Sequence, residues 1–199
     1  MQKFLNIKSF NKIIVVSKPK FYNWFLNLDK KIVCYENINK ISFRKNDILI
    51  SCGTNIIFKK SFFSKFALAI NIHPGSFNFP GRDPHHWACY YQIKDYGATA
   101  HLITEKIDQG IIIDYELKKN TKKLGPKGYN KIADQCSQLL IQKIIKGLNR
   151  KKLTIKSALW TGESNRRADL IKMCDFSHID AEEIKKRKFS FKGFEHYFS

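Results

Sequence analysis

Asn71, His73 and Asp108 are the residues of this sequence whose types and spacing could support catalysis. Asn71 and His73 close an apolar run that begins at residue 67. Residues two apart in a strand project from the same face, so the carboxamide and the imidazole would lie side by side. The following Pro74 favours an extended His73, and the Pro-Gly pair then turns the chain. We therefore expect both side chains where a strand gives way to a loop, which is where open α/β sheets bind ligands.

Neither motif is specific on its own. An Asn-x-His at a strand end is most often a polar pair that nearby backbone satisfies, and an Asp-x-Gly is most often a turn. Their order along the chain, together with three further motifs, is more specific. The full set is Asn71-x-His73-Pro74, a loop ending in Phe79-Pro80-Gly81, a helix start at Asp83-Pro84 that carries Trp87, a Gly97-Ala98-Thr99-Ala100 strand, and Ile107-Asp108-x-Gly110.

This combination resembles the folate-dependent formyltransferase family, which includes the glycinamide ribonucleotide, methionyl-tRNA and nucleotide-sugar formyltransferases. The resemblance is firm from about Asp47 to Glu116. It implies an α/β, Rossmann-like formyltransferase fold, with a mostly parallel central sheet flanked by helices. It also implies 10-formyltetrahydrofolate as the formyl donor, Asn71, His73 and Asp108 as the catalytic residues, and no metal.

The resemblance also points to residues that would hold the folate. The segment from residue 47 to residue 57 is similar to the strand and loop that border the family's folate pocket, where backbone groups meet the pterin ring. A fixed loop in an apolar slot can match the donors and acceptors on that ring edge. The candidate folate-binding residues are Asn55, Ile56, Ile57, Glu105 and Ile107. We expect the side chains of Ile56 and Ile57 to be core residues, and leave His101 and Lys106 as neighbours outside the set.

Formyl transfer requires a neutral amine to attack the formyl carbon on N10 of the folate, which creates an oxyanion. His73 and the Asn71 amide could both donate hydrogen bonds to that oxygen, and losing one such donor commonly costs about 10²–10³-fold in rate. Asp108 could orient or charge His73 and relay a proton from the amine towards N10. The same residues could activate water, so hydrolysis of 10-formyltetrahydrofolate stays an alternative.

Short apolar strands alternate with helix-length segments, which indicates a mostly parallel sheet with right-handed crossovers. We expect strands at residues 12–16, 31–35, 47–52, 67–73, 98–103 and 111–117. We expect helices at residues 21–28, 58–66, 84–93, 127–148, 164–174 and 180–188. Residues 1–150 would form the formyltransferase catalytic domain, and residues 151–199 a short helical C-terminal extension packed on the same domain.

Several local features refine this expectation. In the helix from residue 84, Asp83 would be the N-cap, and Trp87, Tyr90 and Tyr91 would pack in the interior. His85 and His86 are expected in solvent or at the substrate edge. The buried face of the long helix would contain Tyr129, Ile132, Cys136, Leu139, Leu140 and Ile144. No GxGxxG follows the first strand, which argues against a dinucleotide site, and the Gly-rich phosphate loop of glycinamide ribonucleotide enzymes is also missing.

Length and composition suit one soluble domain. The chain has 199 residues, of which 43% are hydrophobic, enough to bury a substantial core. No apolar run approaches the roughly 20 residues that span a bilayer, and no signal-peptide pattern is present, so no membrane partner is expected. Five cysteines lie scattered without a CxxC spacing, which favours a reducing compartment and a cytoplasmic location.

The net charge of +19 leaves the acceptor amine open. It would suit a nucleotide or nucleic-acid partner, but it also fits an AT-rich genome that uses much lysine. We expect a nucleotide-linked amino sugar as acceptor. The alternatives are an aminoacyl-tRNA or another amine and, outside enzymes, a catalytically silent folate- or nucleotide-binding module. A homodimer is also left open.

Overall fold

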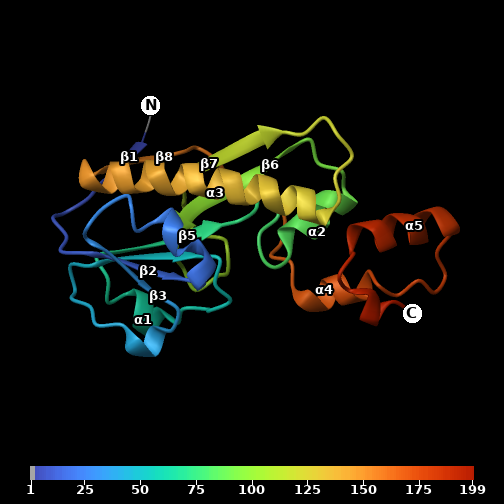
Figure 1. Cartoon of the computed structure of the whole chain (residues 1–199), viewed down its shortest axis with the longest axis horizontal. Coiled ribbons are helices and arrows are strands. Elements are labelled where there is room, and N and C mark those ends of the chain that lie inside the picture. Colours follow the sequence, from blue (N-terminus) through green and yellow to red (C-terminus); the bar gives the residue numbers. More distant parts are fainter. Residues whose placement is uncertain (1–2) are drawn as a thin grey trace.

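A six-stranded sheet forms the centre of the computed structural model, which describes residues 3–199 (Figure 1). The strand order is β3-β2-β4-β5-β6-β7. The first four strands are parallel, and β6 and β7 are antiparallel to their neighbours. The strands are β2 (Ile13–Ser17), β3 (Ile32–Tyr35), β4 (Ile48–Cys52), β5 (Leu68–His73), β6 (Asp95–Leu102) and β7 (Ile112–Lys119). The expected mostly parallel α/β fold is thus confirmed.

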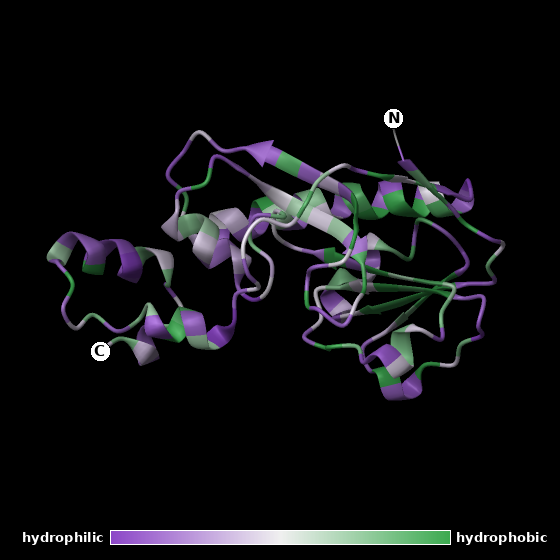
Figure 2. Cartoon of the chain, turned by 180° about the vertical axis from the view of Figure 1, so that it is seen from behind, coloured by the Kyte–Doolittle hydropathy of each residue, from purple (hydrophilic) through white to green (hydrophobic). Residues whose placement is uncertain are grey.

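Apolar side chains cover both faces of the central strands, which explains why β2 and β4 are buried along their whole length and are mostly hydrophobic. On one face, Ile70 and Ile72 pack against the long helix α3 (Pro126–Asn149). The other face packs against an aromatic group that includes Phe58 and Phe66 and surrounds α1 (Lys60–Phe63). Figure 2 shows the central strands as the most hydrophobic part of the chain.

Two of the predicted helices are much shorter than expected. The segment from residue 21 contains a 3₁₀ helix, η1 (Pro19–Trp24), and the segment from residue 58 contains only the four residues of α1. Neither has a capping side chain at its start, and aromatic residues with modest helix propensity dominate both. A further 3₁₀ turn, η2 (Ile38–Lys40), connects β3 to β4.

The C-terminal residues lie at both ends of the molecule. β8 (Lys152–Ile155) pairs with β1 (Lys3–Asn6) in a separate two-stranded sheet that the sequence analysis missed. The helices α4 (Arg167–Lys172) and α5 (Ala181–Ser190) and the turn η3 (Glu195–Tyr197) lie beside α2 (Pro84–Tyr90) at the opposite end (Figure 1). Phe191 and Phe194 join Trp87 in one buried cluster there.

Four local predictions were wrong. Asp83 adopts a left-handed conformation and makes no capping hydrogen bond, because its carboxylate binds Arg167 instead. His86 is buried, and its Nδ1 lies 2.8 Å from the Ser190 carbonyl oxygen. Tyr91, which follows the last residue of α2, is 57% exposed, and Leu139 on α3 is 42% exposed. In the part of the chain that the structure describes, no helix is long and apolar enough to span a membrane.

Candidate active site

Asn71 and His73 lie at the carboxyl end of β5, where the sequence placed them. Strand β6 runs antiparallel beside β5, with His101 opposite Asn71 and Thr99 opposite His73. The loop that leaves β6 returns Asp108 to the same end of the sheet. The predicted catalytic residues are therefore in direct contact, although about 35 residues separate Asp108 from the other two.

Asp108 is the centre of the cluster, because four N–H groups converge on its carboxylate. Oδ1 accepts hydrogen bonds from Asn71 Nδ2 at 3.1 Å and from His101 Nε2 at 3.2 Å. Oδ2 accepts from the Gly81 backbone N–H at 3.0 Å and from His73 Nδ1 at 3.3 Å. A buried carboxylate is stable only when it is satisfied in this way.

This arrangement favours an imidazolium–carboxylate pair. Burial by itself would raise the pKa of Asp108, but the charge of His73 and the hydrogen bonds from both histidines hold that pKa well below its ordinary value. Burial likewise opposes protonation of His73, but Asp108 and the Phe79 carbonyl raise the His73 pKa above its ordinary value. His73 Nε2 donates to Phe79 O at 2.9 Å, so both ring nitrogens face acceptors.

Backbone geometry holds the carboxylate in place. Asp108 has a φ of 49°, a left-handed conformation that costs most residues about 1–2 kcal/mol and that Asp tolerates better than most. Gly81, whose N–H binds Asp108, has a φ of 91°. Any side chain at this position would place its Cβ 2.3 Å from the backbone oxygen of Asn165, so only glycine fits. Strain of this kind is often concentrated at functional sites.

Two aromatic side chains that the sequence analysis did not assign complete the cluster. His101 is buried between Asn71 and Asp108. Trp160, from the C-terminal residues, packs edge-on against His73 and His101, with ring centroids 5.8 and 5.1 Å away. Its Nε1 donates to Gly110 O at 2.7 Å. The register of the predicted strands could have placed His101 opposite Asn71, but nothing in the sequence indicates the position of Trp160.

A cavity of about 460 Å³ opens beside this cluster. It is lined by Asn71, His73 and Asp108, by the loop after β4 and by Ile107. Three predicted folate-binding residues, Asn55, Ile56 and Ile57, also line it. Glu105 is not among the lining residues, because its exposed carboxylate pairs with Lys60 at the surface. The expectation that Ile57 is a core residue was wrong, since the side chain is 69% exposed, whereas Ile56 packs against the core.

The cavity wall is also rich in positive charge. The cations are Lys18 and Lys20 after β2, Arg82 before α2, and Arg167 from α4. Arg167 binds Asp83 through Nε at 2.8 Å. His85, as expected, lies at this cavity, and burial together with His86 and Arg167 lowers its pKa to about 3.

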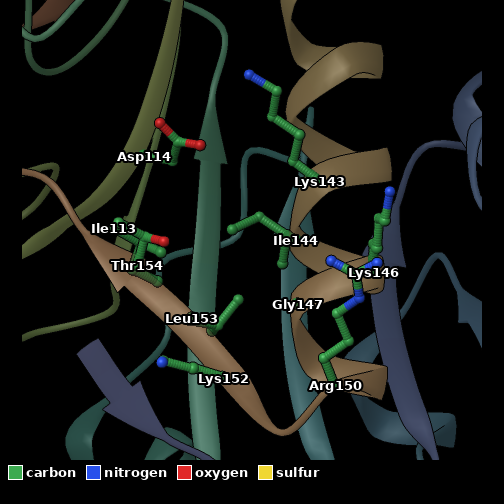
Figure 3. Close-up of a pocket in the computed structure, with 10 residues that line it drawn as sticks. All are labelled: Ile113, Asp114, Lys143, Ile144, Lys146, Gly147, Arg150, Lys152, Leu153 and Thr154. Atoms are coloured by element: carbon green, nitrogen blue, oxygen red, sulfur yellow. The ribbon is translucent and has the colours of Figure 1, made fainter.

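A second cavity, of about 290 Å³, shares no residue with the first. Figure 3 shows Lys143, Lys146 and Arg150 projecting from α3, with Asp114 on β7 and Lys152 on β8. Lys143 pairs with Glu116, and Asp114 pairs with Lys156 at 3.1 Å. This cavity contains no His, Ser or Cys side chain, so the first cavity is the candidate active site. Across residues 3–199, no group of three or more His, Cys, Asp or Glu side chains could hold a metal ion.

The fold and the cluster together define a Rossmann-like α/β domain with an Asn-His-Asp site, and several solved structures with the same fold are formyltransferases. A 4-N formyltransferase from Francisella tularensis superimposes with a TM-score of 0.75 at 21% identity, covering 90% of this chain and 87% of that one. A sugar N-formyltransferase from a Shewanella species gives 0.72 at 18% identity, covering 91% and 87%.

A third similar structure is the formyltransferase PseJ from Anoxybacillus kamchatkensis, with a TM-score of 0.67 and 20% identity over 88% of this chain and 97% of that one. That protein was solved with a UDP-linked formamido sugar and tetrahydrofolate. No family model matches the sequence, and no curated protein sequence matches it significantly. The comparisons therefore establish the formyltransferase fold.

Proposed function

We propose that this protein transfers a formyl group from 10-formyltetrahydrofolate to the amine of a nucleotide-linked amino sugar. The observation that carries the proposal is the convergence of Asn71, His73 and Asp108 at one edge of a cavity large enough for a pterin ring. We further propose that residues 1–150 form the catalytic domain and that residues 151–199 are an extension packed on it.

The loop after β4 suits the folate. Asn55 and Ile57 line the cavity, and within residues 3–199 their backbone N–H and C=O groups take part in no backbone hydrogen bond. These groups are free to pair with a pterin edge, as the resemblance implied. Ile107 and the exposed Ile57 supply apolar surface beside them. The side chain of Glu105 contributes nothing to this pocket.

The formyl donor supplies the electrophilic carbon, and the protein supplies positive charge where the oxyanion develops. His73, kept as an imidazolium by Asp108, provides that charge. One hydrogen of the Asn71 amide binds Asp108. The nearby His101 Nε2 also donates to Asp108, so it offers no acceptor to the second Asn71 hydrogen, which can bind the oxyanion. The Nε2–H of His73 can also bind the oxyanion, but only after its hydrogen bond to Phe79 O is broken.

The acceptor proposal rests on charge and on the structural neighbours. Lys18 and Lys20, which follow β2 next to the loop after β4, line the cavity together with Arg82, and these cations could bind a diphosphate. A neighbour from Helicobacter canadensis was solved with folinic acid and dTDP-3-aminofucose, and PseJ with a UDP-sugar. A cytoplasmic location would supply both the folate and the sugar nucleotide.

The experiment is an acceptor panel. The protein is incubated with 10-formyltetrahydrofolate and, separately, amino-sugar nucleotides, simple amines and aminoacyl-tRNA, while release of tetrahydrofolate is measured. Release that depends on an amino-sugar nucleotide supports the proposal. Release without any amine would identify a hydrolase instead, and binding without release a silent binding module.

A substitution tests the role of Asn71. Asn71→Ala should lower kcat by about 10²-fold, because the oxyanion loses a hydrogen-bond donor, and should raise KM for the folate much less. Steady-state kinetics with the best acceptor of the panel measure both constants. A variant with a normal kcat and a raised KM would show that Asn71 only binds substrate.

A further inference from the structure

The catalytic cluster contains no group that could remove a proton from the acceptor. Free amines are largely protonated near neutral pH, and an ammonium nitrogen has no lone pair for attack. Asp108 already accepts four hydrogen bonds, and His73 is held in its protonated form. The proton must therefore pass to water or to a base elsewhere in the cavity.

Three carboxylates line the cavity, and only one of them is free of a strong partner. Asp108 already accepts four hydrogen bonds. Asp83 is bound by two nitrogen atoms of Arg167, at 2.8 and 3.0 Å. Asp134, on α3, forms no ion pair with any residue that the structure describes. Its one side-chain hydrogen bond is a long one, 3.5 Å from Asn130 Nδ2.

Ser137 gives an independent sign of a ligand next to Asp134. It lies three residues further along α3, which puts both side chains on one face of the helix. Ser137 lines the same cavity and is only 1% exposed, yet its hydroxyl has no hydrogen-bond partner within residues 3–199. A buried hydroxyl without a partner is costly unless a bound molecule satisfies it.

Asp134 also lies at the catalytic end of the sheet. Burial is the main cause of the raised pKa of Cys52, the last residue of β4, and of Tyr96 on β6, and the nearby charge of Asp134 adds to both shifts. The Tyr96 hydroxyl donates to the carbonyl oxygen of Pro74, which directly follows His73.

We propose that Asp134 binds the ammonium group of the acceptor and accepts its proton, an inference that rests on the proposed formyl transfer. An N–H bond of the ammonium breaks, an O–H bond forms on Asp134, and the electron pair stays on the nitrogen. The neutral amine then attacks the formyl carbon beside His73. Asp134 returns its proton to water, and the second amine proton leaves with N10 of the folate. Ser137 is placed to bind a neighbouring hydroxyl of the sugar.

The surroundings of Asp134 suit this role. Burial raises its pKa above the ordinary value, and Lys20, facing it from the segment after β2, opposes that shift. The other titratable groups that its charge reaches are Cys52 on β4 and Tyr96 on β6, while Asn130 on α3 is neutral. A carboxylate with a raised pKa is a better proton acceptor near neutral pH than a fully solvated one.

A binding experiment tests the first half of the proposal without requiring turnover. Calorimetry at pH 6.5 would compare dTDP-3-aminofucose, the sugar nucleotide of the Helicobacter canadensis neighbour, with dTDP-fucose, which lacks the amine. The unaltered protein should prefer the amine by about tenfold. Asp134→Asn should remove the preference, while Asp114→Asn, a carboxylate of the second cavity, should keep it. An unchanged preference in Asp134→Asn would overturn the proposal.

The pH dependence of turnover tests the second half. With the best acceptor of the panel, Asp134→Asn should reduce kcat/KM about 10²-fold at pH 6.5 and less than tenfold at pH 9, where the amine is already neutral. A defect of equal size at both pH values would indicate a merely structural role and refute the inference. A protein that binds neither sugar nucleotide and turns over none would instead refute the proposed acceptor class, and this inference with it.

Discussion

At the scale of single residues, the site depends on one buried carboxylate. Charges are stable in a protein interior only when polar partners replace the lost water, and Asp108 has four such partners. Those partners also fix its role: Asp108 keeps His73 protonated and orients Asn71. The proton relay that the sequence suggested for Asp108 is not part of our proposal, because its low pKa makes it a poor base.

Asp108→Asn should reduce kcat by at least about 10²-fold, because His73 loses the charge that keeps it protonated. The burial that opposes protonation would then dominate, so the His73 pKa should fall below its ordinary value. Nuclear magnetic resonance of the imidazole nitrogens measures that pKa directly. Asp114→Asn is the matched control, and an unaltered His73 pKa in Asp108→Asn would contradict the assignment.

The ion pair should also make stability depend on pH. The folded state raises the pKa of His73, so its contribution is fully present below the ordinary His pKa of about 6.5 and is lost as pH rises through the raised value. The folded state lowers the pKa of Asp108, so that contribution is present above about 3.9 and is lost as pH falls towards the lowered value. Denaturant titrations from pH 4 to 9 should show His73→Gln losing more stability at pH 5 than at pH 9.

At the scale of secondary-structure elements, α2 and the C-terminal helices depend on one another. The cluster around Trp87, Phe191 and Phe194 holds α5 beside α2, and Arg167 of α4 lines the cavity. The C-terminal residues therefore contribute directly to the wall of the active site. Trp160, which contacts both histidines, is a second link of the same kind.

Phe191→Ala should destabilise the protein by about 3–5 kcal/mol, because it removes a fully buried ring and leaves a cavity among its aromatic neighbours. For a chain of this length the loss corresponds to a fall in Tm of roughly 10 °C. Phe189→Ala is the matched control two residues away, near the end of α5, since Phe189 is 41% exposed and should change Tm by only a few degrees. Equal losses in both variants would argue against the packing described here.

Strands were easier to predict than helices, for physical reasons. Runs such as 13–17 and 48–52 are apolar because the sheet is covered on both faces, and that pattern is local in the sequence. The pairing of β1 with β8 joins residues about 150 apart, and no local pattern indicates it. Asn71, His73 and Asp108 were recognisable from their motifs, whereas Asp134 and Trp160 reach the site only through tertiary packing.

At the scale of the whole molecule, the net charge of +19 should influence which anions bind. The cations of the cavity wall would make binding of a sugar diphosphate modestly sensitive to salt. A dedicated tRNA site would neutralise many phosphates, and its affinity would fall about 10³-fold or more between 50 and 200 mM salt.

We expect weak binding of tRNA that is lost by 200 mM NaCl, together with acceptor binding that falls only a few-fold over the same range. Filter binding and calorimetry measure the two affinities. Tight tRNA binding that survives 200 mM NaCl would instead favour the aminoacyl-tRNA alternative.

Analytical ultracentrifugation at the same two salt concentrations would determine whether the protein forms the homodimer that the sequence left open.

The hydrogen bonds to Asp108 come from β5, from β6 and from the loop before α2, so they tie together segments that meet only in the finished fold. An inactive descendant could not lose this carboxylate alone: four orphaned donors would weaken the whole protein until neighbouring positions changed too. Substitutions that remove this carboxylate should consequently lower stability as well as turnover in a random mutagenesis screen.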